Sequence, residues 1–166
     1  MKKILIIQGN PKAESYCQAL AQAYERGASA SGAEVRRIDI GTLTFDPNLQ
    51  FGYSADSPLE EDLVRVQQDI QWAEHLVFVY PNWWGTMPAL LKGLIDRVFL
   101  PGFAFKYRKG SALWDKLLKG RSARLIMTLD TPIWYYNLIQ KKPGVNMMKK
   151  TILEFCGITP VRVTTG

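Results

Sequence analysis

The sequence has few of the residues that cross-link small proteins or bind metals. Its 166 residues include two cysteines, Cys17 and Cys156, and one histidine, His75. Two cysteines are too few for a disulfide scaffold, and their spacing fits no metal site. We therefore expect a protein held together by its hydrophobic core, which a chain of this length builds as one domain over residues 1–166.

Long apolar runs and runs of like charge are also missing. No stretch approaches the roughly 18 apolar residues of a membrane-spanning helix. The basic start of the chain leads only to a short apolar run, Ile4–Ile7, with no cleavage site of small residues. We read it as a first strand rather than a signal peptide, and expect a cytoplasmic protein. The formal net charge is +6, but the basic residues are scattered, so no nucleic-acid partner is expected.

The most informative stretch is Leu76–Phe99, LVFVYPNWWGTMPALLKGLIDRVF. The apolar run Leu76–Tyr80 predicts a strand buried on both faces. The aromatic loop Pro81–Gly85 follows, and Pro88 then opens a helix with an apolar stripe. Two adjacent tryptophans cannot both point inward from one strand, because strand side chains alternate faces. Trp83 and Trp84 therefore suit either a packed core or a platform for a flat aromatic ligand.

The rest of the chain alternates strands and helices in the same way. Further strands are predicted at Ile4–Ile7, Val35–Ile40, Ala123–Leu129 and Thr159–Thr165, with a helix opening at Ser57-Pro58 and another over Val145–Phe155. This β-α order with right-handed crossovers predicts an α/β fold of the flavodoxin-like class: a three-layer sandwich around a five-stranded parallel sheet in order 2-1-3-4-5. That fold needs a last helix after the fifth strand. We therefore expect a continuation beyond Gly166, or another chain, to cover that face.

The loops after the first, third and fourth strands are expected to meet at one edge of the sheet. The first contains Asn10 and leads to Ser15 at a helix N-terminus, where backbone N–H groups and the helix dipole favour a phosphate. A plain capped turn explains the same residues. The other two loops, PNWWG and TLDTPIWYYN, are aromatic. One phosphate-binding turn beside two aromatic loops favours a flavin nucleotide over other common cofactors.

Tyr80–Phe99 resembles the pattern P-x-x-W, then P-A-x-L-K-G-x-x-D/E-R-V-F, of the NAD(P)H:quinone oxidoreductase (DT-diaphorase-like) family of flavodoxin-like flavoproteins. The stretch TLDTPIWYYN stands where many members have a T-T-G-G loop, and LEFCGI is similar to the segment before the family's last strand. The resemblance covers nearly the whole chain. It implies FMN or FAD as cofactor, NAD(P)H as co-substrate, a quinone-like acceptor and a homodimer with two shared sites.

The resemblance also implies roles for individual residues. The flavin phosphate loop is lined by Asn10, Ser15, Tyr16 and Cys17. The isoalloxazine ring is held on one side by Pro81, Asn82, Trp83, Trp84 and Gly85, and on the other by Thr128, Leu129, Asp130 and Tyr135. The acceptor contacts Trp84, and Phe105 and Tyr107 of the partner subunit reach over the flavin. Tyr107 and Tyr135 become the candidate catalytic side chains.

Three other functions stay open at this point. Some members of the family are ancillary subunits of potassium-efflux antiporters, so a membrane transporter is a possible partner. A flavodoxin-type electron carrier has the same fold, although such carriers are usually acidic. A flavin-free Rossmann-like module is the third alternative.

His75 is expected to end the second helix, where a positive charge is favourable, and to have no part in catalysis.

Overall fold

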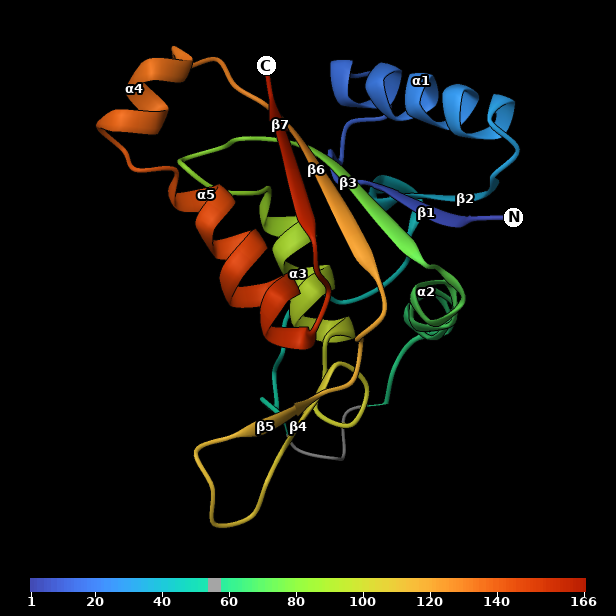
Figure 1. The fold of residues 1–166 in the computed structure, drawn as a ribbon, viewed down its shortest axis with the longest axis vertical. Coiled ribbons are helices and arrows are strands. Elements are labelled where there is room, and N and C mark those ends of the chain that lie inside the picture. The colour runs from blue at the N-terminus through green and yellow to red at the C-terminus, as the bar shows by residue number, and fades with distance from the viewer. Residues whose placement is uncertain (54–57) are drawn as a thin grey trace.

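The computed structural model describes residues 1–53 and 58–166. Its main sheet has five parallel strands in the order β2-β1-β3-β6-β7. The strands are β1 (Lys3–Gln8), β2 (Glu34–Asp39), β3 (His75–Pro81), β6 (Ser122–Thr128) and β7 (Val161–Thr165). Because β4 and β5 form a separate hairpin, this is the predicted 2-1-3-4-5 order, and the predicted fold class is confirmed (Figure 1).

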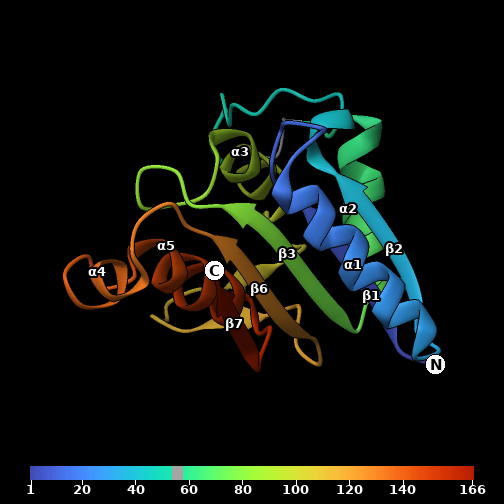
Figure 2. The same ribbon diagram turned by 90° about the horizontal axis from the view of Figure 1, so that it is seen from above.

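Helices cover both faces of the sheet, because strand side chains alternate between the faces. On one face Ile4 and Ile6 pack with Ala21 of α1 (Tyr16–Ala30). On the other face Leu5 and Ile7 belong to the larger core. That core includes residues of α2 (Glu61–Trp72), α3 (Ala89–Val98), α5 (Pro143–Asn146) and the π-helical segment η2 (Met147–Glu154), which continues α5 (Figure 2).

The face that carries α1 is only partly covered. The helix packs on β1, β2 and β3. Beyond it, alternate residues of β6 on that face, Ser122, Arg124, Ile126 and Thr128, are half-buried. Their neighbours Ala123, Leu125 and Met127 are buried in the opposite core.

Three short elements were not predicted from the sequence. They are the 3-10 turn η1 (Ile40–Thr42), the hairpin of β4 (Phe105–Tyr107) and β5 (Trp114–Lys116), and the helix α4 (Ile133–Leu138). The hairpin is held by packing, since the Trp114 ring stacks on Phe155 at 4.4 Å and its Nε1 donates to the Phe155 carbonyl at 2.9 Å. Strands of three residues give no periodic signal, so the sequence did not reveal them.

The predicted helix ends are mostly confirmed. The Ser15 hydroxyl accepts the N–H of Gln18 at 3.2 Å as the N-cap of α1. The chain leaves the helical segment after η2 at Gly157, whose φ of +98° is the left-handed conformation typical of a C-cap. The predicted start of the second helix at Ser57-Pro58 falls partly on Ser57, which lies outside the described residues; α2 begins at Glu61.

The predicted position of His75 at the end of the second helix was wrong. His75 is the first residue of β3 and does not end a helix, because α2 already ends at Trp72. Burial, with Lys2, Arg124 and Arg162 nearby, lowers the pKa of His75 from 6.5 to about 4. The imidazole is therefore neutral, with Nδ1 2.8 Å from the Ser122 hydroxyl and Nε2 3.4 Å from that of Tyr24.

Candidate functional site

The turns that follow β1, β3 and β6 meet at one edge of the sheet. Parallel register places Pro81 opposite Thr128 at the ends of β3 and β6. The Gly9 N–H donates to the Val79 carbonyl at 2.7 Å, and the Asn82 N–H donates to the Thr128 carbonyl at 2.8 Å. The sheet thus fixes the three turns beside one another at the strand ends where α/β folds bind ligands.

The turn after β1 presents backbone donors. Asn10 is buried, and its Oδ1 accepts the Lys12 N–H at 3.0 Å, which shapes the turn. Within the described residues, the N–H groups of Ser15 and Tyr16 have no acceptor. They lie at the positive end of the α1 dipole, so this turn has the donors that an anion requires.

Cys17 lies in the first turn of α1 and contacts the end of β6. Its Sγ is 3.6 Å from the Thr128 hydroxyl, and its side chain is buried. Burial raises the pKa of the Cys17 thiol, so the thiol stays protonated near neutral pH. Such a cysteine supports the site by packing and is a poor nucleophile.

The turn after β3 is strained. Trp83 and Thr86 exchange backbone hydrogen bonds at 2.8 and 3.1 Å. Between them Trp84 and Gly85 have φ of +53° and +81°, the pattern of a type I′ turn. Glycine adopts positive φ freely, whereas a tryptophan there is a costly outlier of the kind found at functional sites. Trp84 is fully exposed and Trp83 is 44% exposed, so neither ring belongs to the core.

The turn after β6 leads through α4 to α5 and is anchored by Tyr136. This is the buried residue of α4, and its phenol oxygen accepts the Val145 N–H at 3.2 Å. Burial raises the pKa of Tyr136, which keeps the hydroxyl protonated. Next to it, a Cβ on Gly144 would lie 2.6 Å from the Gly85 carbonyl oxygen. The start of α5 therefore packs directly against the tryptophan turn.

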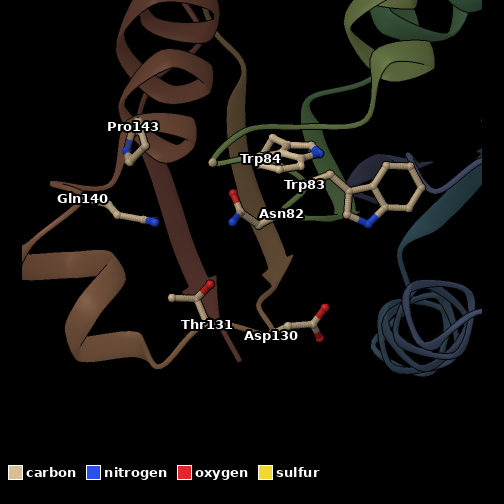
Figure 3. Close-up of a pocket in the computed structure, with 8 residues that line it drawn as sticks. Asn82, Trp83, Trp84, Asp130, Thr131, Gln140 and Pro143 are labelled. Carbon is tan, nitrogen blue, oxygen red and sulfur yellow. The ribbon is translucent and has the colours of Figure 1, made fainter.

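The turns after β3 and β6, with Gln140 and Pro143, border an open cavity of about 820 Å³, within the range of cofactor sites. Figure 3 shows Asn82 and Trp84 on one side, Asp130 and Thr131 on another, and Gln140 and Pro143 from the α4–α5 connection. The complete lining is Asn82, Trp83, Trp84, Gly85, Asp130, Thr131, Gln140 and Pro143. The Trp83 ring points away from the Trp84 ring, toward α1 (Figure 3).

Two polar atoms of the tryptophan turn have no partner. Within the described residues, Oδ1 of Asn82 and Oγ1 of Thr86 are buried without a hydrogen bond. Buried polar atoms are nearly always satisfied, so an unsatisfied pair beside a cavity points to a missing ligand or ordered water. The residues present fit a flavin. The cavity offers an exposed indole and polar groups to a flat ring system that is polar at one edge, and the turn after β1, at the same edge of the sheet but outside the cavity, has free donors for a phosphate.

The structure brings together part of the predicted set. Of the predicted residues, Asn82, Trp83, Trp84, Gly85 and Asp130 line the cavity. Those that do not line it are Pro81, Thr128, Leu129, Tyr135 and the phosphate-turn residues Asn10, Ser15, Tyr16 and Cys17. Sequence reasoning missed Thr131, Gln140 and Pro143. The signal available for two of them was that the polar residues Thr131 and Gln140 flank a mostly apolar stretch.

Phe105 and Tyr107 lie elsewhere in the same chain. They belong to the hairpin, which lies at the opposite end of the molecule from α4 (Figure 1). Phe105 is only 5% exposed and packs edge-on against Tyr107 and Phe155 at 5.1 and 5.3 Å. Tyr107 is 64% exposed. Both border a second, more apolar cavity of about 340 Å³ between the hairpin, α3 and η2.

The fold and the cavity together define an α/β protein with a ligand site at the carboxyl edge of a flavodoxin-like sheet. Residues 2–166 match the family described as "Flavodoxin-like fold", and the chain belongs to that family.

Three similar proteins narrow the family. An "Uncharacterized NAD(P)H oxidoreductase" of Haemophilus influenzae is 28% identical over 162 residues, which cover 95% of this chain and 79% of that protein. NAD(P)H dehydrogenase (quinone) 1 of Cavia porcellus is 29% identical over 95% of this chain and 65% of its own length. The crystal structure of Smu.1420 from Streptococcus mutans UA159 has a TM-score of 0.83 and 33% identity, covering 99% of this chain and 86% of that one. The predicted similarity to NAD(P)H:quinone oxidoreductases is confirmed, and the chain spans less than two thirds of the guinea-pig enzyme's length.

Proposed function

We propose that this protein is a flavin-dependent NAD(P)H:quinone oxidoreductase that binds FMN or FAD. The observation that carries the proposal is a cavity of about 820 Å³ lined by the two aromatic turns, at the same edge of the sheet as the turn after β1 and its free backbone donors. A bound flavin would supply the redox chemistry, taking hydride from NAD(P)H and passing it to a quinone or similar acceptor. The protein binds and orients the flavin and the substrates and excludes water from the site.

Each turn has a distinct task in this proposal. Asn10, Ser15, Tyr16 and Cys17 hold the flavin phosphate, with the free N–H groups at the start of α1 as donors. The turn Pro81–Gly85 presents an indole face and the unsatisfied Asn82 amide to the ring. On the other side lie Thr128, Leu129, Asp130 and Tyr135. Backbone donors from both aromatic turns favour negative charge on the ring, as donors of an oxyanion hole do.

The acceptor pocket is proposed to be completed by a second copy of the chain. In one protomer Trp84 lines the cavity and Tyr135 belongs to α4 beside it, and the exposed Tyr107 ring beside Phe105 is the surface offered to the other. The two tyrosine hydroxyls would donate hydrogen bonds to the acceptor oxygens. A homodimer with two shared sites follows, and analytical ultracentrifugation measures it directly.

The first test is cofactor uptake. The purified protein is heated, and any released small molecule is identified by mass and visible spectrum; protein without flavin is titrated with FMN and with FAD. Addition of NADH or NADPH without oxygen is expected to bleach bound flavin in a stopped-flow instrument. Failure to bind either flavin contradicts the proposal, and flavin that NAD(P)H does not bleach indicates an electron carrier instead.

The second test is steady-state kinetics. Because one pocket receives the nicotinamide and then the quinone, the two substrates exclude each other and the mechanism is ping-pong. Double-reciprocal plots at several quinone concentrations are expected to be parallel. Intersecting lines would mean that both substrates bind at once, which a single pocket does not allow.

A further inference from the structure

The helix α4 exposes its apolar side chains to solvent. Trp134, Leu138 and Ile139 are 62%, 72% and 58% exposed, and Ile133 is exposed as well. We call these four residues the α4 patch. In both ribbon views α4 lies at the margin of the molecule (Figures 1 and 2). Large apolar side chains gathered on one projecting element mark an interaction surface.

Lysines follow this patch along the chain. Residues 131–151 contain four lysines, Lys141, Lys142, Lys149 and Lys150, and no acidic residue. Within the described part of the chain none of these lysines forms an ion pair, whereas Arg36, Arg37 and Arg97 all do. The local charge is therefore free to act on a partner.

The backbone holds two of the lysines next to the patch. Lys141 and Lys142 both have positive φ, +59° and +54°. The Lys142 N–H donates to the Tyr136 carbonyl at 3.1 Å, and the Asn146 side chain donates to the Lys141 carbonyl at 2.8 Å. The turn is thus fixed to α4 and α5, and both lysine side chains are exposed directly after Ile139.

The patch also adjoins the flavin-site cavity. Thr131 lies just before α4 and Gln140 just after the patch, and both line that cavity. Whatever surface covers the α4 patch is therefore close to the cavity lining. An apolar molecule leaving that surface has a short path into the site.

We propose that the α4 patch and its lysines dock the protein onto an anionic lipid surface, and that its acceptor is a quinone dissolved in that lipid. A short projecting element with Trp, Leu and Ile flanked by lysines has the composition of segments that bind in the bilayer interface. The unpaired lysines complement anionic head groups. The acceptor part rests on the proposed function, whereas the docking part does not. In the described residues no helix has the length and hydropathy to cross a bilayer.

The docking test is flotation with vesicles of phosphatidylcholine alone or mixed with phosphatidylglycerol. The protein is expected to float with the mixed vesicles and to be released by high salt, because salt screens exposed charges. The variants Lys141→Gln/Lys142→Gln and Leu138→Ser/Ile139→Ser are each expected to weaken binding by at least about tenfold. A matched control, Arg26→Gln/Lys119→Gln, removes the same charge from exposed sites elsewhere and is expected to bind as the wild type does. Equal binding by all variants, or no binding to mixed vesicles, overturns the proposal.

A separate assay distinguishes this proposal from the proposed function. Reduction of a short water-soluble quinone tests the site alone, and reduction of a long-tailed quinone in mixed vesicles tests docking as well. Leu138→Ser/Ile139→Ser is expected to retain the first activity and lose most of the second. If the variant keeps both activities, the lipid-acceptor proposal is overturned, whereas the proposed oxidoreductase function still stands. A fall in the mass of the oligomer in this variant shows instead that α4 contacts a second copy, which also overturns it.

Discussion

The phenol oxygen of Tyr136 accepts the backbone N–H of Val145 at 3.2 Å, and this contact fixes α4 to the start of α5. We expect Tyr136→Phe to lower the free energy of unfolding by about 1–2 kcal/mol, because a buried N–H is left without an acceptor. Flavin affinity should fall with it, since the α4–α5 connection lines the cavity. Tyr135→Phe is the control: Tyr135 is partly exposed, and its hydroxyl has no hydrogen bond within the described residues. Equal stability of the two variants in urea would contradict this role for Tyr136.

Gly144 is required where α5 packs on the tryptophan turn. A Cβ there would lie 2.6 Å from the Gly85 carbonyl oxygen and 3.0 Å from the Thr86 Cα, and backbone atoms cannot move aside cheaply. We expect Gly144→Ala to displace the turn and raise the flavin Kd by about tenfold, measured by fluorescence titration. Gly27→Ala is the control, because a Cβ at Gly27 in α1 meets nothing within 4 Å. It should leave flavin affinity unchanged and stabilise the helix by about 0.5–1 kcal/mol.

Trp84 is a case in which stability and function are opposed. Its positive φ is strained and its ring is fully exposed, so the fold gains little from tryptophan at this position. Asn-Gly is the favoured pair for a type I′ turn, and we expect Trp84→Asn to raise the free energy of unfolding by about 0.5–1 kcal/mol. The same change should weaken flavin binding, because a stacking face is lost. If the variant binds flavin as tightly as the wild type does, Trp84 has no role in flavin binding.

Arg97 ties the long segment after β2 to α3. Its buried guanidinium bonds Glu60 Oε2 at 2.7 Å, the Pro58 carbonyl at 3.4 Å and the Asp46 carbonyl. We expect Arg97→Met to destabilise the protein by about 3 kcal/mol, because Glu60 and the two carbonyls lose their donor. Lys92→Met removes the more exposed ion pair with Asp96 from the same helix and should cost less than about 1 kcal/mol. Similar urea midpoints for both variants would refute the anchoring role.

His75 makes stability depend on pH. The pKa of His75 is about 4 in the folded protein and near 6.5 in the unfolded chain. As pH falls, the unfolded chain therefore binds a proton at His75 before the folded protein does, which favours unfolding. Its contribution to stability is therefore complete above pH 6.5 and is lost between pH 6.5 and 4. We expect a loss of about 1 kcal/mol after allowing for solvent screening of a half-buried group. The difference in unfolding free energy between wild type and His75→Gln should be constant above pH 6.5 and shrink toward pH 4; a constant difference throughout would contradict it.

The regular elements were predictable because their signals are local. The apolar run Leu76–Tyr80 fixes a buried strand, and the alternation of such runs with amphipathic helices implies a parallel sheet. Because parallel strands end at one edge, the meeting of the turns after β1, β3 and β6 also followed from the sequence. The exposure of Trp83 and Trp84 was one of two alternatives, and only the tertiary structure decides between them.

The sequence alone thus determined the order of strands and the edge that carries the site, since periodicity and chain order are properties of the sequence itself. Tertiary packing decided the rest. The hairpin exists because Trp114 stacks on Phe155, and His75 is neutral because it is buried, with cations from distant parts of the chain nearby. The site is shaped by Gly144 against Gly85, a contact between residues 59 positions apart that no local pattern encodes.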